Sequence, residues 1–176
     1  MYYAFIVNNQ IDGTGELPIT GNGIESVRIS EKAYKNIEKY MWNGEKVVIN
    51  PNYEEEQLIQ AKQNKYIEAK EKAYIYLESG EALYEFEENK HIEATDGNIG
   101  KFTAYALGFM AGSTSSVVWC TKEDETVLLN AEQVTDILQG LGAVQAQVWI
   151  VKFTDYINEI NAATTVEEVE AIEINY

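Results

Sequence analysis

Residues Asn130–Asn161 read NAEQVTDILQGLGAVQAQVWIVKFTDYINEIN and hold the longest sustained helical pattern of the chain. Asn130 and Gln133 have the spacing of a capping box, in which each side chain binds the other residue's backbone N–H at the start of a helix. Apolar residues then recur at alternating steps of three and four, which places them on one helical face: Val134, Ile137, Leu141, Val144, Val148 and Val151. The segment therefore predicts a long amphipathic helix at the centre of a core.

Two glycines, Gly140 and Gly142, lie inside this predicted helix. A glycine in a helix interior costs about 1 kcal/mol relative to alanine. Close approach of another helix, at 102–111, would offset that cost, and a break in the helix at the glycines is the alternative. The sequence leaves both explanations open.

The segments around this helix complete a C-terminal module. A threonine or aspartate at 95–96 can cap a helix at about 98–111, and Thr165 begins a last short helix that reaches about Ile172. Runs of β-branched and aromatic residues predict strands, two of which form a hairpin with a charged tip before the long helix: 82–86, 90–93, 117–121 and 126–129.

Residues 1–52 predict a small β-rich module that carries one helix. Ser30 is a suitable cap for this helix, which has about ten residues. The segment 12–18 is dense in turn-forming residues and predicts a turn, and Asn43-Gly44 predicts a hairpin. Strands are expected where β-branched and aromatic residues cluster: 2–7, 26–29 and 46–49.

The segment 53–80 predicts a long connecting helix, because neither glycine nor proline occurs in it before Gly80. An a/d seam typical of a coiled coil runs along it, interrupted by Lys62 near its start. Packing of the helix on its own C-terminal module is the favoured arrangement, and pairing of copies of the chain through this seam, as a homo-oligomer such as a trimer, is the alternative. The predicted interface residues are Ile59, Tyr66, Ala69, Ala73 and Tyr76.

The expected fold class is α+β in three parts. These are the β-rich N-terminal module (1–52), the long helix or stem (53–80), and a C-terminal helical module with a β-hairpin (81–176).

Charge and composition exclude several classes of protein. The 29 acidic and 13 basic side chains give a formal charge of −16, which repels nucleic acid phosphates. No apolar run approaches the roughly 20 residues that span a bilayer, and the amino terminus lacks the features of a signal peptide. A single cysteine, Cys120, excludes an internal disulfide and a cysteine-rich zinc site. We expect a cytosolic protein that binds neither nucleic acid nor membrane.

No residue pattern predicts catalysis or a cofactor. Asp12-Gly13-Thr14-Gly15 lacks the lysine and serine of a phosphate loop, and His91 is the only histidine, too few for the usual zinc site. Cys120 is expected to be a small packed side chain on a strand. Acidic clusters such as 54–56 lack the alternating ligands of a calcium loop. We therefore expect a non-enzymatic protein with no cofactor and no metal.

Short segments of the C-terminal half form a recognisable series: a lysine-rich helix, the helix with 104–111, Val-Val-Trp at 117–119, Thr-Val-Leu-Leu-Asn-Ala-Glu-Gln at 126–133, and Ala-Ala-Thr-Thr opening the ending at 162–172. The series resembles a domain of uncharacterised function found in bacteriophage and prophage tail proteins, and it covers about residues 60–172. Tyr-Ala-Phe-Ile-Val-Asn at 3–8 and Pro-Asn-Tyr-Glu-Glu at 51–55 are similar to the opening of small proteins encoded beside phage tail-fibre or baseplate genes.

The resemblance implies a structural accessory protein that attaches tail-fibre or baseplate proteins. Such a protein is made in the bacterial host cytoplasm and stays in the virion tail. The alternative is a tail-fibre assembly chaperone, which binds the receptor-binding fibre while that fibre folds. A cell-wall hydrolase would need a carboxylate pair, which the sequence does not locate.

Overall fold

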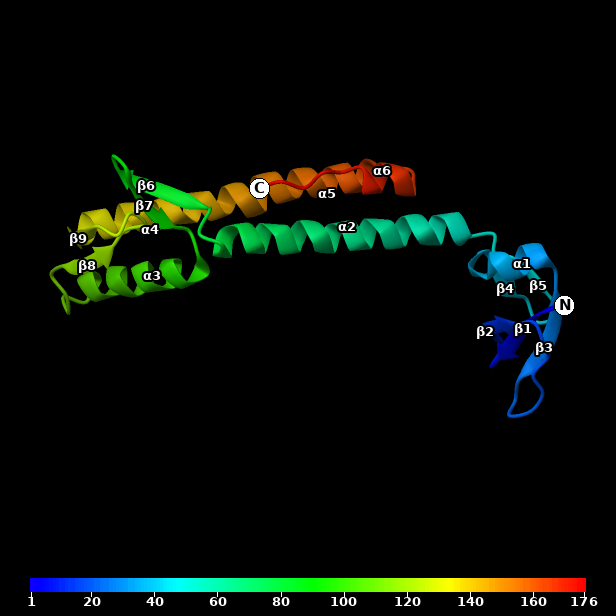
Figure 1. The fold of residues 1–176 in the computed structure, drawn as a ribbon. Coiled ribbons are helices and arrows are strands. Elements are labelled where there is room, and N and C mark those ends of the chain that lie inside the picture. The colour runs from blue at the N-terminus through cyan, green and yellow to red at the C-terminus, as the bar shows by residue number, and fades with distance from the viewer. The chain divides into compact units, whose positions relative to one another are not determined.

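The computed structural model describes residues 1–176 and divides into two compact units, Met1–Ile59 and Gln60–Tyr176. The helix α2 (Tyr53–Glu78) begins in the first unit and continues through the second (Figure 1). The expected mixture of helices and strands is confirmed, with several small antiparallel sheets, one long helix and a helical C-terminal part.

The first unit contains a three-stranded antiparallel sheet in the order β2-β1-β3. Its strands are β1 (Tyr2–Val7), β2 (Gln10–Gly15) and β3 (Glu25–Ile29). The prediction of a turn over 12–15 is wrong, because β2 continues through these residues. The physical reason is the ring of Phe5 in β1, whose Cζ would lie 2.7 Å from a Cβ at Gly15. Glycine is therefore used here to seat an aromatic ring on the neighbouring strand.

The helix after Ser30 is shorter than predicted. The α-helix α1 covers Glu31–Lys35, and a single 3₁₀ turn follows at Ile37–Lys39. Ser30 does cap α1, since its Oγ accepts a hydrogen bond of 3.1 Å from the N–H of Ala33. Beyond the turn, the predicted hairpin is present as β4 (Tyr40–Trp42) and β5 (Val47–Ile49). The core of this unit consists of Ala4, Ile6, Ile29, Ala33 and Trp42.

The second unit holds most of the helices. The predicted 130–161 helix is confirmed as one continuous run of helical turns, in which α4 passes into a π-helical segment, η2, and then into α5. The bounds of the helices are α3 (Asp96–Met110), α4 (Ala131–Ala146), η2 (Gln147–Lys152), α5 (Phe153–Ala162) and α6 (Val166–Glu170).

The four predicted strands of this unit are present, and they form two antiparallel hairpins. They consist of β6 (Leu83–Glu87) with β7 (Lys90–Glu93), and of β8 (Val117–Cys120) with β9 (Thr126–Leu129). The predicted caps are also present. Thr95 and Thr165 accept hydrogen bonds from backbone N–H groups of α3 and α6, and Asn130 forms the full capping box with Gln133.

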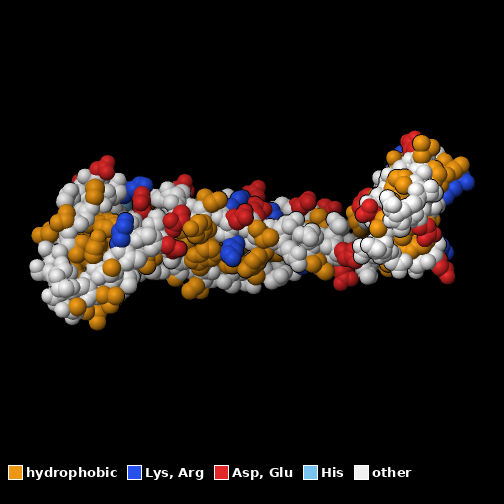
Figure 2. Space-filling model, turned by 90° about the horizontal axis from the view of Figure 1, so that it is seen from below, with side chains coloured by type: hydrophobic (Ala, Val, Ile, Leu, Met, Phe, Trp, Pro, Cys, Tyr) orange, Lys and Arg blue, Asp and Glu red, His pale blue; other side chains and the backbone are white.

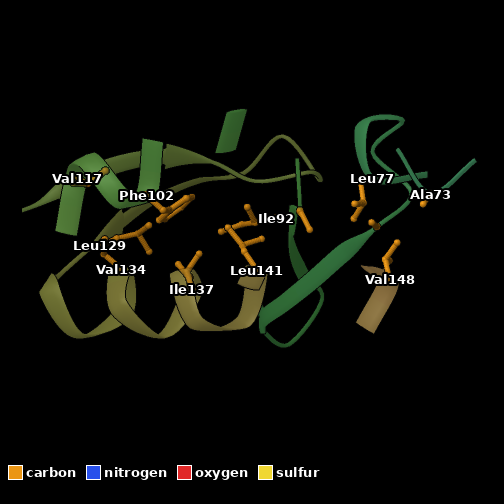
Figure 3. Close-up of a cluster of buried hydrophobic side chains, with 12 residues drawn as sticks. Ala73, Leu77, Ile92, Phe102, Val117, Leu129, Val134, Ile137, Leu141 and Val148 are labelled. Atoms are coloured by element: carbon orange, nitrogen blue, oxygen red, sulfur yellow. The ribbon is translucent and has the colours of Figure 1, made fainter. Parts of the chain in front are cut away.

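The main core lies where α4 faces α3 and the two hairpins (Figure 3). Ile137 and Leu141 of α4 point toward Phe102 of α3 and Ile92 of β7. Deleting a side chain such as Leu141 from this core would cost about 2–5 kcal/mol. The buried members are Ala73, Leu77, Ala82, Ile92, Ala94, Phe102, Val117, Leu129, Val134, Ile137, Leu141 and Val148.

The two glycines of α4 have different surroundings. A Cβ at Gly140 would collide with the ring of Tyr84, which comes from β6, whereas a Cβ at Gly142 would meet open space. Close contact at Gly140 is therefore present, but with a strand residue and not with the predicted helix. The alternative of a broken helix is wrong, because α4 continues through both glycines to Ala146.

Candidate functional site: an arm of two helices and a tail

The residues of the predicted seam on α2 differ in how deeply they are buried. Ala69 and Ala73 are fully buried within the second unit, and Tyr76 packs against the main core. Ile59 and Tyr66 remain 49% and 43% exposed. This part of α2 therefore packs on its own module, the arrangement that the sequence favours over a coiled coil. Homo-oligomerisation through α2 stays a prediction. Of the predicted interface residues, only Ile59 and Tyr66 are exposed enough to contribute to it.

A C-terminal tail, residues 171–176, runs back along α5 (Figure 1). Ile172 and Ile174 are buried, and they form a second small core with Ala69 of α2 and Ile160 of α5. Figure 1 shows α2 and α5 side by side in this region, and the shared core agrees with it. We call the assembly of α2, α5 and the tail the arm.

Polar side chains bind the backbone of the tail, which lies in no sheet. The hydroxyl of Tyr156 accepts a hydrogen bond of 2.8 Å from the N–H of Asn175 and donates one of 2.6 Å to its carbonyl. Lys65 and Lys72 each donate to a tail carbonyl at 3.3 Å. These hydrogen bonds tie the backbone of the tail to side chains of α2 and α5.

Tyr176, in the tail, contacts both helices of the arm. Its ring lies 5.5 Å from that of Tyr156 and 6.3 Å from that of Tyr76, and its hydroxyl donates a hydrogen bond of 2.9 Å to the carbonyl of Ala69. Burial, together with the neighbouring Tyr156, raises the pKa of Tyr176 to about 12. The hydroxyl therefore stays protonated and keeps donating at any physiological pH.

An open groove lies between α2 and α5, with a volume of about 400 Å³. No tail residue lines it. Tyr66 borders the groove and meets Phe153 of α5 edge-on, with ring centroids 5.5 Å apart. The lining residues are Lys62, Gln63, Tyr66, Ile67, Ile157, Ile160 and Asn161. We call this the α2–α5 groove.

A second pocket, of about 500 Å³, lies among β7, α3 and the β8–β9 hairpin. Its two lysines already have partners. Lys122 forms an ion pair of 2.6 Å with Glu93, and the Nζ of Lys101 lies 5.5 Å from the ring centroid of Trp119. The pocket therefore contains balanced charges.

His91 and Cys120 have different surroundings. The backbone N–H and Nδ1 of His91 lie 3.0 and 2.8 Å from the two carboxylate oxygens of Glu123, which fixes the hairpin tip against β7. Hydrogen bonding from the His91 N–H lowers the pKa of Glu123 to about 2. The expectation of a packed Cys120 is wrong, because Cys120 is exposed and Val117 is the residue of β8 that enters the core.

Among all 176 residues, no group of histidine, cysteine, aspartate or glutamate side chains is arranged to hold a metal ion. No helix combines the length and the apolar composition that a membrane crossing requires. Comparison of the chain with protein-family models, with curated proteins and with solved structures finds no match. The resemblance to phage tail proteins therefore stays a prediction.

The tail is the part of the arm that sequence reasoning missed. The last predicted helix was expected to reach about Ile172, but α6 ends at Glu170. A usable signal was present, because apolar and polar residues alternate strictly from Ile172 to Tyr176. Such a period of two indicates an extended segment with one buried face.

Proposed function

We propose that the chain is a non-enzymatic accessory protein of a bacteriophage or prophage tail, which attaches a tail-fibre or baseplate protein to another tail component. The observation that carries this proposal is the division of the chain into two compact units. Each unit has its own hydrophobic core, and α2 is shared between them. A chain of this kind can offer one unit to each of two partners. The resemblance supports the same context, since its segments fall on both units.

The second candidate is a tail-fibre assembly chaperone. Exposed apolar side chains on α2 favour it, because Ile67, Tyr74 and Ile75 are 51%, 55% and 63% exposed. Clustered apolar surface of this kind commonly marks a binding site for another protein. The charge of −16 would keep such a protein soluble between rounds of binding.

Quantitative mass spectrometry of purified particles tests the proposal. The host would carry the gene with an affinity tag, and both mature particles and infected-cell extracts would be sampled. A structural protein is expected in mature particles at a fixed ratio to the baseplate proteins. Presence with the fibre in extracts but absence from mature particles would replace the structural role with the chaperone. Absence from both would reject both candidates.

A matched pair of variants sharpens the test. Ile67→Asp places a charge on the exposed face of α2, whereas Met110→Asp places one on α3, where the side chain is 84% exposed. If the second unit attaches through α2, incorporation falls for the first variant and is unchanged for the second. Equal incorporation of both would move the attachment to another surface.

A further inference from the structure

One face of α2 carries a regular row of alternating lysine and tyrosine. Lys62, Tyr66, Lys70 and Tyr74 follow one another at steps of four, a spacing that puts side chains side by side on a helix. Tyr66, Lys70 and Tyr74 are exposed. Figure 2 shows hydrophobic side chains gathered over the part of α2 that belongs to the second unit.

The row borders the α2–α5 groove, to which Lys62 and Tyr66 both contribute. Ile67 of α2 and Ile157 and Ile160 of α5 supply its apolar walls. Lysine is the only charged type of residue that lines the groove, and no carboxylate does. In a chain with a formal charge of −16, this is a local reversal of sign.

Neither lysine of this row forms an ion pair within the chain. Lys70 takes part in none of the ion pairs of the chain. Lys62 donates only to the main-chain carbonyl of Asn161, at 2.8 Å. The charge of Lys62 already acts on the carboxylate of Glu168 in α6, although the two form no ion pair. A carboxylate of an occupant would therefore find Lys70 without an ion pair beside the groove, and Lys62 at its wall.

We propose that the α2–α5 groove binds an amphipathic α-helix of another protein, with apolar residues facing the groove and acidic residues along its flanks. Two adjacent helices present ridges and a furrow into which a third helix packs. Apolar anchors at helical spacing fill such a groove, as in known helix-in-groove complexes. Opposite charge at Lys62 and Lys70 would fix the identity and register of the incoming helix.

A second copy of the chain is the less suitable occupant. Two copies that met through this face would set lysine rows against each other, and each copy carries a formal charge of −16. Both effects oppose self-association. The partner is therefore a different chain with an acidic amphipathic helix.

This inference rests on the proposed function in one respect, since it names the surface by which the second unit would hold a tail protein. Its test needs neither phage nor particle. Failure of peptide binding together with incorporation into particles would reject the groove alone. Peptide binding together with absence from particles would reject the structural role alone.

Two designed peptides of about 20 residues are the probes, each with leucine at the a and d positions of a heptad pattern. One carries glutamate at the flanking e and g positions, and the other carries lysine there. Fluorescence polarisation measures their binding to the full chain at low and at physiological salt. We expect the acidic peptide to bind about tenfold more tightly than the basic one, with a difference that shrinks as salt rises.

Variants of the full chain assign the site. Lys62→Glu/Lys70→Glu should reverse the order of the two peptides. Ile67→Asp should weaken the acidic peptide at least about tenfold, whereas Met110→Asp, the exposed control on α3, should leave it unchanged. Circular dichroism melting checks that each variant folds.

Several results would overturn the inference. Equal affinity of both peptides would remove the role of the lysines, and equal loss in Ile67→Asp and Met110→Asp would place binding elsewhere. Light scattering that detects a dimer, dissolved by Ile67→Asp, would make a second copy the occupant of the groove.

Discussion

The ring of Tyr84 in β6 lies directly over Gly140 in α4, so close that no Cβ could be added there without moving it. This contact joins the β6–β7 hairpin to the central helix of the second unit. The glycine is therefore part of the packing between strand and helix.

Gly140→Ala is expected to destabilise the protein by about 1–3 kcal/mol, because the ring of Tyr84 must leave its position. Urea unfolding followed by circular dichroism measures the change. Gly142→Ala is the matched control, since a Cβ there meets open space and alanine favours the helix by up to about 1 kcal/mol. The same loss of stability in both variants would contradict the packing role of Tyr84.

The capping box at the start of α4 offers a second prediction. The side chain of Asn130 accepts a hydrogen bond of 3.0 Å from the N–H of Gln133, whose own side chain accepts one of 3.0 Å from Asn130. Asn130→Ala should lower the free energy of unfolding by about 1 kcal/mol. Thr135→Ala, an exposed change one turn into the same helix, should be close to neutral. A neutral Asn130→Ala would show that the cap does not stabilise α4.

Tyr156→Phe tests how the tail is held. The change removes the hydroxyl that binds both the N–H and the carbonyl of Asn175 while keeping the ring in the small core of the arm. Hydrogen exchange followed by NMR should detect faster exchange of the Asn175 amide. Tyr74→Phe, on the exposed face of α2, is the control and should leave that amide unchanged. Unaltered protection in Tyr156→Phe would mean that burial of Ile172 and Ile174 holds the tail without the hydroxyl.

The contact between Glu123, at the tip of the β8–β9 hairpin, and His91 of β7 should make the free energy of unfolding depend on pH. The N–H of His91 holds the pKa of Glu123 at about 2, below the ordinary value of 4.5. Because the pKa is lower in the folded state, the stabilising effect of this carboxylate is complete above about pH 4.5 and is lost as the pH falls toward 2. Glu123→Gln should therefore be less stable than the parent chain at pH 7, and the difference should narrow below pH 4.5. Urea unfolding between pH 2 and 7 measures both, and NMR titration of the Glu123 carboxyl carbon reports the pKa directly. A constant difference over this range would contradict the proposed interaction.

Much of the fold was predictable because its signals are local. The capping pair at Asn130, the threonine caps at Thr95 and Thr165, and the turn at Asn43-Gly44 act within a few residues of the chain. Each is present in the folded structure. The burial of Val134, Ile137 and Leu141 follows from helical periodicity in the same way.

The errors occurred where distant contacts decide. The sequence around Gly15 predicts a turn, but Gly15 lies in β2, where the ring of Phe5 from the neighbouring strand leaves no room for a side chain. Gly140 suggested a neighbouring helix, whereas its neighbour is a tyrosine far back along the chain. The α2–α5 groove could not be located from the sequence, because it lies between two helices that are far apart along the chain.

The π-helical segment η2 sets the phase between the two halves of the long central helix. Before it, Val134, Ile137 and Leu141 face the main core, and after it, Ile160 faces the small core of the arm. Each residue of an α-helix turns the chain by about 100°, so removal of a single residue from η2 would swing Ile160 away from the tail while leaving α4 intact. The number of residues between the two cores therefore determines whether both can be filled at once. Chain length at η2 should tolerate less change than composition does.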